Sequence, residues 1–187
     1  MFPRIRSKDT LEMIEKKRLK FESFSFFEQV LEYLPLILIF GGLTYIAGRF
    51  LYANLIKQQN LLFAIVIFLL VLLLSFFVIY SRINATKLTR IKGINRSKNR
   101  AYIKTFSKKH SWELSVHNQD YSVLYKPWSW KSVDWGKNIF ILYDKHDLLV
   151  CSIRYTRHYT ISPFHRFANR KTTKRIKKEL EIIRKNS

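Results

Sequence analysis

The residues from Leu61 to Tyr80 form an unbroken run of twenty residues that is apolar except for Ser75 and carries no charge. A helix rises about 1.5 Å per residue, so a helical run of this length spans about 30 Å, the thickness of the hydrocarbon core of a bilayer. The core helix of a soluble protein would instead show polar positions every three or four residues. The run therefore predicts a transmembrane helix over residues 61–80.

A second apolar stretch precedes this run. Tyr33 to Gly48 gives sixteen uncharged residues, Arg49 interrupts the pattern, and residues 50–56 continue it. An arginine near the end of a span can extend its charged group to the lipid headgroups. Pro35 falls in the first turn, where a missing N–H costs little. We therefore predict a second span over about 33–55, and because only "KQQN" separates the two spans, they form a tight hairpin.

Basic residues flank this hairpin unevenly. Four precede it in residues 16–20 and seven follow it in residues 82–100, whereas the turn side has only Arg49 and Lys57. The positive-inside rule then places both termini in the cytoplasm. We expect no cleaved signal peptide, because the apolar run starts too late and no small-residue cleavage site follows it.

Three small residues, Gly41, Thr44 and Gly48, have i, i+3 and i+7 spacing and fall on one face of the first span. Small residues let helix backbones approach closely in lipid. The pattern is typical of self-association through the transmembrane segment. Packing of the same face against the second helix of the hairpin is an equal alternative.

The segment before the hairpin, "KDTLEMIEKKRLKFESFSFFEQV", has the pattern of an amphipathic helix. Asp9 and Glu12 form a candidate capping pair. Apolar residues, including Leu11 and Ile14, fall near one face, and lysines lie off it. This composition is typical of an interfacial helix on the inner leaflet. A short helix that packs on the cytosolic domain is the alternative.

The remaining chain, residues 82–187, carries 25 Lys or Arg against 7 Asp or Glu, which accounts for +18 of the net charge of +21. Its hydrophobic patterns predict a small α+β domain with an antiparallel sheet, in the order helix, four strands, helix. The expected elements are a helix at 96–110, strands at 111–118, 121–128, 138–144 and 148–155, and a helix at 174–185. The chain thus divides into an N-terminal segment (1–30), a membrane hairpin (31–81) and a basic cytosolic domain (82–187).

We find no pattern of residues that favours catalysis. Asp144 and Asp147 sit at a turn without the Glu-x-Lys of a nuclease core, and Asp134 with Lys137 has the wrong spacing for it. No phosphate-binding glycine loop or nucleophile motif is present, and the histidines show no metal-ligand pairing. The single cysteine, Cys151, fits a reducing compartment and a buried small hydrophobe. We therefore expect no enzyme activity, no metal and no cofactor.

Anion binding has more support, because cations crowd the segment between the last strand and the last helix. Ser162 before Pro163 is a candidate helix N-cap, and Asn169 is a candidate cap of the last helix. Helix N-termini and arginine side chains both bind phosphates. The alternatives are a nucleotide or nucleic-acid site, a face attracted to anionic lipid, and a solvated surface. The candidate ligand-binding residues are Arg154, Arg157, His158, His165, Arg166, Arg170, Lys171 and Lys174.

Trp128, Trp130 and Trp135 lie in one loop with two lysines. They are candidates for a base-stacking wall, a membrane-interface anchor or a hydrophobic plug, and we favour a plug for one or two of them.

The whole order, an amphipathic helix, a two-span hairpin and a compact basic domain, resembles the small two-transmembrane effectors of bacterial antiphage systems, in CBASS and in type III CRISPR loci. The resemblance implies an inner-membrane protein whose cytosolic domain binds a cyclic oligonucleotide and whose oligomerised hairpins disrupt the membrane. It rests on architecture, so no binding residue follows from it. The alternative is a membrane-anchored adaptor or a constitutive pore that docks on a protein partner, RNA or anionic lipid.

Overall fold

The computed structural model describes residues 5–21, 26–128, 136–155, 162 and 166–185 of the 187-residue chain, without the side chains of residues 26–33, 35, 166 and 167. The chain divides into two compact units. One comprises residues 24–83 and is called here the hairpin, and the other comprises residues 1–23 and 84–187 and is called the sheet domain. Each unit is described separately.

The hairpin consists of two long helices, α2 (Phe26–Lys57) and α3 (Leu61–Ile83). Gln58 and Asn60, in the connection between them, have positive φ angles of 53° and 48°. Two stretches, Leu36–Lys57 and Leu61–Ile83, are long and apolar enough to cross a membrane by length and composition. The predicted pair of long apolar helices is therefore confirmed.

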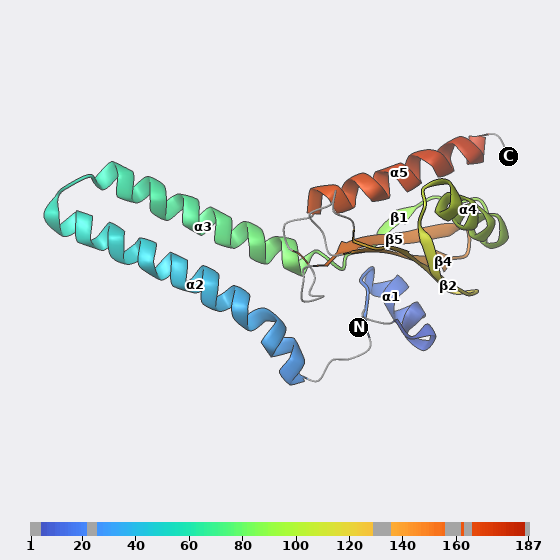
Figure 1. The fold of residues 1–187 in the computed structure, drawn as a ribbon, viewed down its shortest axis with the longest axis horizontal. Coiled ribbons are helices and arrows are strands. Elements are labelled where there is room, and N and C mark those ends of the chain that lie inside the picture. Colours follow the sequence, from blue (N-terminus) through green and yellow to red (C-terminus); the bar gives the residue numbers. More distant parts are fainter. Residues whose placement is uncertain (1–4, 22–25, 129–135, 156–161, 163–165, 186–187) are drawn as a thin grey trace. The chain divides into compact units, whose positions relative to one another are not determined.

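The sheet domain contains one antiparallel sheet of five strands in the order β1-β5-β4-β3-β2 (Figure 1). The prediction of four strands is wrong by one, because the three-residue strand β1 carries no apolar alternation of its own. It pairs with β5, and Arg90 of β1 donates hydrogen bonds to Asp144 and Asp147, which flank the turn between β4 and β5. The strands are β1 (Thr89–Ile91), β2 (Glu113–His117), β3 (Tyr121–Lys126), β4 (Lys137–Asp144) and β5 (Asp147–Arg154).

Two helices, α4 (Arg96–Lys109) and α5 (Arg166–Lys185), cover one face of this sheet (Figure 1). Ile103 and Phe106 of α4 and Ile176 of α5 are buried against the strands. The Asn95 side chain caps α4 by accepting a hydrogen bond from the Lys98 backbone N–H at 2.8 Å. Since α5 begins eight residues before the predicted start at 174, Asn169 lies inside it, and its predicted role as a cap is wrong.

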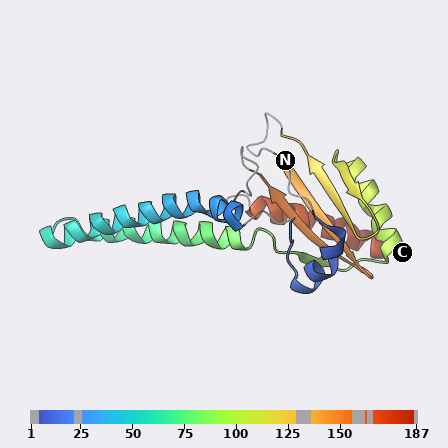
Figure 2. The same ribbon diagram turned by 90° about the horizontal axis from the view of Figure 1, so that it is seen from below.

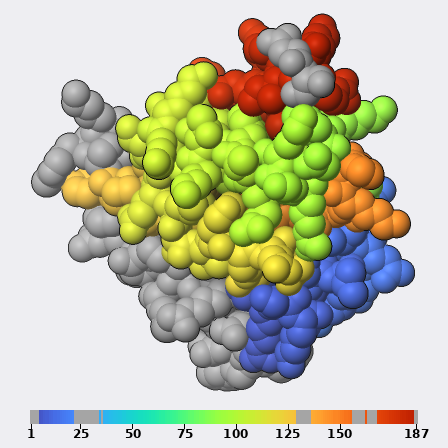
Figure 3. Space-filling model, turned by 90° about the vertical axis from the view of Figure 1, so that its right-hand side faces the viewer, coloured from blue at the N-terminus to red at the C-terminus, as the bar shows by residue number. Residues whose placement is uncertain are grey.

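The opposite face of the sheet is covered by the N-terminal segment, with the 3-10 helix η1 (Ser7–Asp9) and the helix α1 (Thr10–Lys16). Figure 2 shows this segment in front of the strands and α5 behind them, and Figure 3 shows the strands between α4 and the blue N-terminal segment. Met13 is 1% exposed, and Tyr121 donates a hydrogen bond to the Ile5 carbonyl at 3.1 Å. Packing on the domain, the alternative to an interfacial helix, is the arrangement found in the structure.

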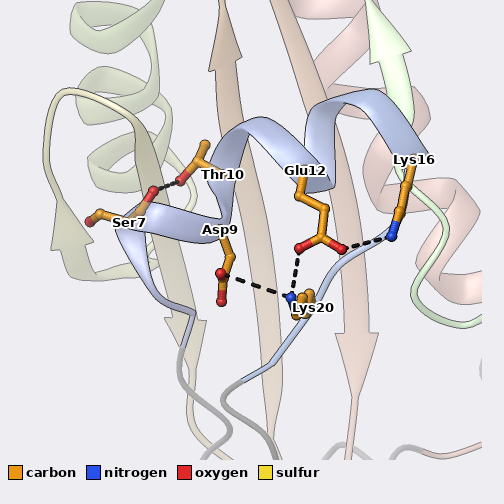
Figure 4. Close-up of polar contacts among 6 residues, drawn as sticks. All are labelled: Ser7, Asp9, Thr10, Glu12, Lys16 and Lys20. Carbon is orange, nitrogen blue, oxygen red and sulfur yellow. Dashed lines mark hydrogen bonds and ion pairs between the residues drawn. The ribbon is translucent and has the colours of Figure 1, made fainter.

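The N-terminal helix differs from the predicted one in length and in its buried face. It ends at Lys16 instead of continuing toward α2, and the next residue, Lys17, has a left-handed φ of 51°. Leu11, placed on the apolar face by the sequence, is 80% exposed. Asp9 makes no side-chain cap bond, and the Glu12 carboxylate instead accepts hydrogen bonds from Lys16 and Lys20 at 2.7 and 2.6 Å (Figure 4). Contacts with the sheet, rather than helical periodicity, decide this local structure.

Candidate anion-binding surface

The outer face of α5 is almost entirely cationic. Ile176 and Leu180 point inward and are 0% exposed, which fixes the rotation of the helix. From Arg170 to Lys178 every exposed residue is a lysine or an arginine. These six are Arg170, Lys171, Lys174, Arg175, Lys177 and Lys178.

The neighbouring helix α4 extends this cationic surface. The Tyr102 hydroxyl of α4 donates a hydrogen bond to the Ile176 carbonyl of α5 at 3.3 Å, and Glu179 contacts His110 at 2.7 Å. The two helices therefore lie side by side over the sheet. Their exposed cations that lack an ion pair among the described residues are named here the basic layer: Lys98, Lys104, Lys108, Arg170, Lys171, Lys174, Arg175, Lys178, Arg184 and Lys185.

Elsewhere in the sheet domain the acidic residues are mostly engaged with basic ones. Arg90 bonds to Asp144 at 2.6 Å and to Asp147 at 3.0 Å. Arg96 pairs with Asp120 at 2.8 Å. Because most of the described carboxylates are used in ion pairs, the charge of the basic layer stays largely uncompensated within the described part of the chain.

The predicted ligand-binding residues fall into three groups. Arg170, Lys171 and Lys174 lie together on the outer face of α5. Arg154 is half-buried at the end of β5, where it pairs in register with Lys137 of β4. Three others, Arg157, His158 and His165, lie outside the described residues, and the side chain of Arg166 is not described. Pro163 of the predicted helix cap also lies outside the described residues.

A row of cations at the ends of three strands was not predicted. Lys137 of β4 pairs in register with Lys126 of β3 on one side and with Arg154 of β5 on the other. Side chains of directly paired residues share a face of the sheet, and like charges in such positions are unfavourable. Trp112 offsets part of this cost, since its ring centroid lies 5.9 Å from Lys126 Nζ and 5.2 Å from Lys137 Nζ. Only the strand register, once known, could reveal this row.

An open depression of about 220 Å³ lies beside the first turn of α4, lined by Arg96, Ser97, Arg100 and Gln119. Burial lowers the pKa of the nearby His117, and the charges of Arg100 and Lys104 lower it further. His117 Nδ1 lies 2.7 Å from the Ser122 hydroxyl. The cations that line this depression are two arginines, Arg96 and Arg100.

Reactive groups are sparse in the described residues. Cys151 is 4% exposed, and burial raises its pKa to about 12, so the predicted buried small hydrophobe is confirmed. Asp144 and Asp147 are held by Arg90, as described above. No group of three or more His, Cys, Asp or Glu side chains in the described ranges is placed to hold a metal ion. Of the loop tryptophans, Trp128 is half-buried, and Trp130 and Trp135 lie outside those ranges.

The small residues of the first span are placed partly against the second helix. The Thr44 hydroxyl lies 3.2 Å from the Ser75 hydroxyl of α3. A Cβ on Gly48 would meet the Phe68 ring at 3.7 Å, whereas one on Gly41 would meet nothing within 4 Å. Thr44 and Gly48 thus serve packing within the hairpin, and Gly41 faces open space.

No known protein family, curated protein or solved structure matches this chain.

Proposed function

We propose that this protein is a two-span membrane protein that binds a phosphate-rich ligand through the basic layer of its sheet domain. The observation that carries the proposal is the outer face of α5, where all six exposed positions from Arg170 to Lys178 are cationic. Lysine and arginine stay charged at every physiological pH, and arginine adds bidentate hydrogen bonds to phosphate. A surface of this kind favours ligands with several phosphates.

Membrane insertion is supported by the exposed apolar surface of the hairpin. Only 11% of the apolar window in each long helix is buried. Leu62, Leu73 and Phe76 are 81%, 63% and 69% exposed. Leaving apolar surface in water costs about 25 cal/mol per Å², so these helices need lipid or another apolar surface around them. The excess of cations before and after the hairpin favours a cytoplasmic sheet domain.

A narrower form of the proposal is an effector in antiphage defence at a bacterial inner membrane. The ligand would then be a cyclic oligonucleotide, and the assembled hairpins would permeabilise the membrane. Its support is the chain architecture alone. Ligand binding would drive such a change only if the ligand binds the assembled state more tightly than the resting state.

The anionic lipid headgroup is the second candidate ligand. The cations lie on the outer faces of two helices, and an extended surface of this kind suits an extended anionic partner. Each lysine or arginine near an anionic leaflet contributes about 1 kcal/mol. The two candidates share the same phosphate chemistry, so the experiment must separate them.

The test uses the full chain in nanodiscs of neutral lipid at ~150 mM salt, where the Debye length is about 8 Å. Cyclic di-, tri- and tetranucleotides and a single-stranded RNA are titrated, and thermal stability is followed. Saturable stabilisation by one cyclic nucleotide supports the narrower form, and stabilisation by RNA supports a nucleic-acid partner. Stabilisation only when the nanodisc contains anionic lipid supports headgroup binding. No response in any arm contradicts the proposed function.

A further inference from the structure

Residues 5–21, named here the strap, cross the sheet face opposite α4 and α5. Few side chains anchor the strap to the sheet: Met13 is 1% exposed, and Ile5 and Leu19 are each 7% exposed. The Phe21 ring packs edge-on against Phe140, with centroids 5.4 Å apart. A helix of two turns such as α1 is not stable in isolation, so the strap is ordered by these anchors.

A short backbone pairing, named here the clasp, closes the strap. The Leu19 N–H donates to the Thr86 carbonyl, and the Leu88 N–H donates to the Lys17 carbonyl, each at 2.9 Å. Arg18 and Lys87 face each other between these two bonds. The clasp therefore joins the chain before the hairpin to the chain after it.

Polar contacts within the strap fold its two ends together. Lys20, beyond the clasp, lies 2.6 Å from Glu12 and 3.9 Å from Asp9 at the start of α1 (Figure 4). The Lys20–Glu12 contact is solvent-exposed, and exposed ion pairs contribute little. These ion pairs therefore add little to the attachment of the strap, which rests on its apolar anchors and on the clasp.

In chain order the strap comes directly before the linker that leads into α2. Six residues lie between Leu19 and the start of α2 at Phe26, so the seven Cα–Cα steps reach at most about 25 Å. After Ile83 the chain reaches the clasp within three residues. A displacement of the start of α2 beyond this reach must first pull the strap off the sheet.

We propose that the strap is a releasable tether between α2 and the sheet domain. Docked, it limits how far the start of α2 can move from the clasp and covers the apolar sheet face around Phe140. Released, it frees α2 from that limit and uncovers the face. This proposal does not depend on which ligand the basic layer binds. The tests below can therefore contradict it without contradicting the proposed function.

Cys151 reports on the position of the strap. It lies in the apolar face that the strap covers, and its thiol donates to the Ala85 carbonyl next to the clasp at 3.3 Å. It is the single cysteine of the chain, so a thiol reagent labels one site. The rate at which a maleimide labels the folded full chain in detergent micelles measures how often this face opens.

Two substitutions in α1 form a matched pair for this assay. Met13→Ala removes a buried anchor, and Leu11→Ala removes a similar side chain that is 80% exposed. We expect Met13→Ala to raise the labelling rate at least tenfold, or about 1.4 kcal/mol, and Leu11→Ala to leave it within about twofold. Amide exchange separates release from unfolding: release speeds exchange at Leu19 and leaves β4 and β5 protected. Equal labelling rates in the two variants, or equal loss of protection throughout the sheet, would overturn the proposal.

A disulfide across the clasp supplies the converse test. The two backbone bonds flank Arg18 and Lys87, so these residues form a non-hydrogen-bonded antiparallel pair, whose geometry suits a disulfide. In the oxidised R18C/K87C variant we expect Cys151 to be labelled at least tenfold more slowly than in wild type, with recovery after reduction. Unchanged labelling of the oxidised form, or crosslinking between two chains instead of within one, would show that the strap is not an intramolecular tether.

Discussion

The two faces of the sheet are covered in opposite ways. On one face, α4 and α5 bury large apolar side chains and leave most of their outer cations without an ion pair in the described part of the chain. On the other, the strap buries a few anchors, and Lys16 and Lys20 both bond to Glu12. Lysines of the strap thus form ion pairs within the strap, whereas lysines of the basic layer keep their charge available to a ligand. Net charge alone does not distinguish these two uses.

The largest effect is expected from breaking the core beneath α4. Phe106 is 1% exposed and packs in the same cluster as Ile103 and Ile176. Phe106→Ala should lower the unfolding free energy of the sheet domain by about 3–5 kcal/mol, the usual cost of such a truncation. Amide exchange should then quicken in β4 and β5 together, in contrast to the local effect of a strap substitution. A change confined to α4 would contradict this difference between the faces.

A smaller effect, on binding rather than on folding, is expected on the outer side of the same helices. R170Q/K171Q/K174Q should weaken binding of the phosphate-rich ligand by about 3 kcal/mol, at about 1 kcal/mol for each cation. The matched control K8Q/K92Q/K145Q removes the same charge from exposed positions outside the basic layer. Both variants should keep the thermal stability of the wild type. Equal losses of affinity in the two triple variants would indicate attraction by net charge, without a defined surface.

The smallest effect concerns the pH dependence of the strap. Hydrogen bonds from Lys16 and Lys20 lower the pKa of Glu12 from 4.5 to about 2. A carboxylate with a depressed pKa stabilises the folded state above the unfolded pKa, and this contribution is lost as the pH falls from about 4.5 to about 2. The labelling rate of Cys151 at pH 6 should therefore be higher in the Glu12→Gln variant than in wild type. Acidification should change this rate less in the variant than in wild type. Solvent and salt screen this exposed contact, so 1 M salt should bring the two proteins closer together.

Locally encoded elements were predicted well from the sequence. The strands expected at 138–144 and 148–155 are found at 137–144 and 147–154, because a short turn joins two strongly apolar runs. The helix expected at 96–110 is found at 96–109, where Asn95 caps it. Periodicity and turn residues suffice wherever the partner of a segment is its neighbour in the chain.

Elements that depend on distant partners were missed. Strand β1 forms against β5 and is held by the bonds of Arg90, and the chain that leaves α1 after Lys16 is held by the pairing of Leu19 with Thr86. The candidate site divides in the same way. The density of cations in the sequence predicted Arg170, Lys171 and Lys174, but the contribution of α4 follows only from its packing beside α5.

The hydroxyl contact inside the hairpin bears on how its two helices can slide along each other. The Thr44 hydroxyl already donates to the Phe40 carbonyl at 2.7 Å, and the Ser75 hydroxyl donates to the Val71 carbonyl at 2.8 Å. Each hydroxyl has a single hydrogen, so their mutual contact at 3.2 Å adds little bonding. If α3 moved by one helical turn, about 5.4 Å, both hydroxyls would keep their carbonyl partners. The hydroxyl pair therefore does little to fix the register of the two helices. A shift along their axes would leave neither of these two hydroxyls without a hydrogen-bond partner.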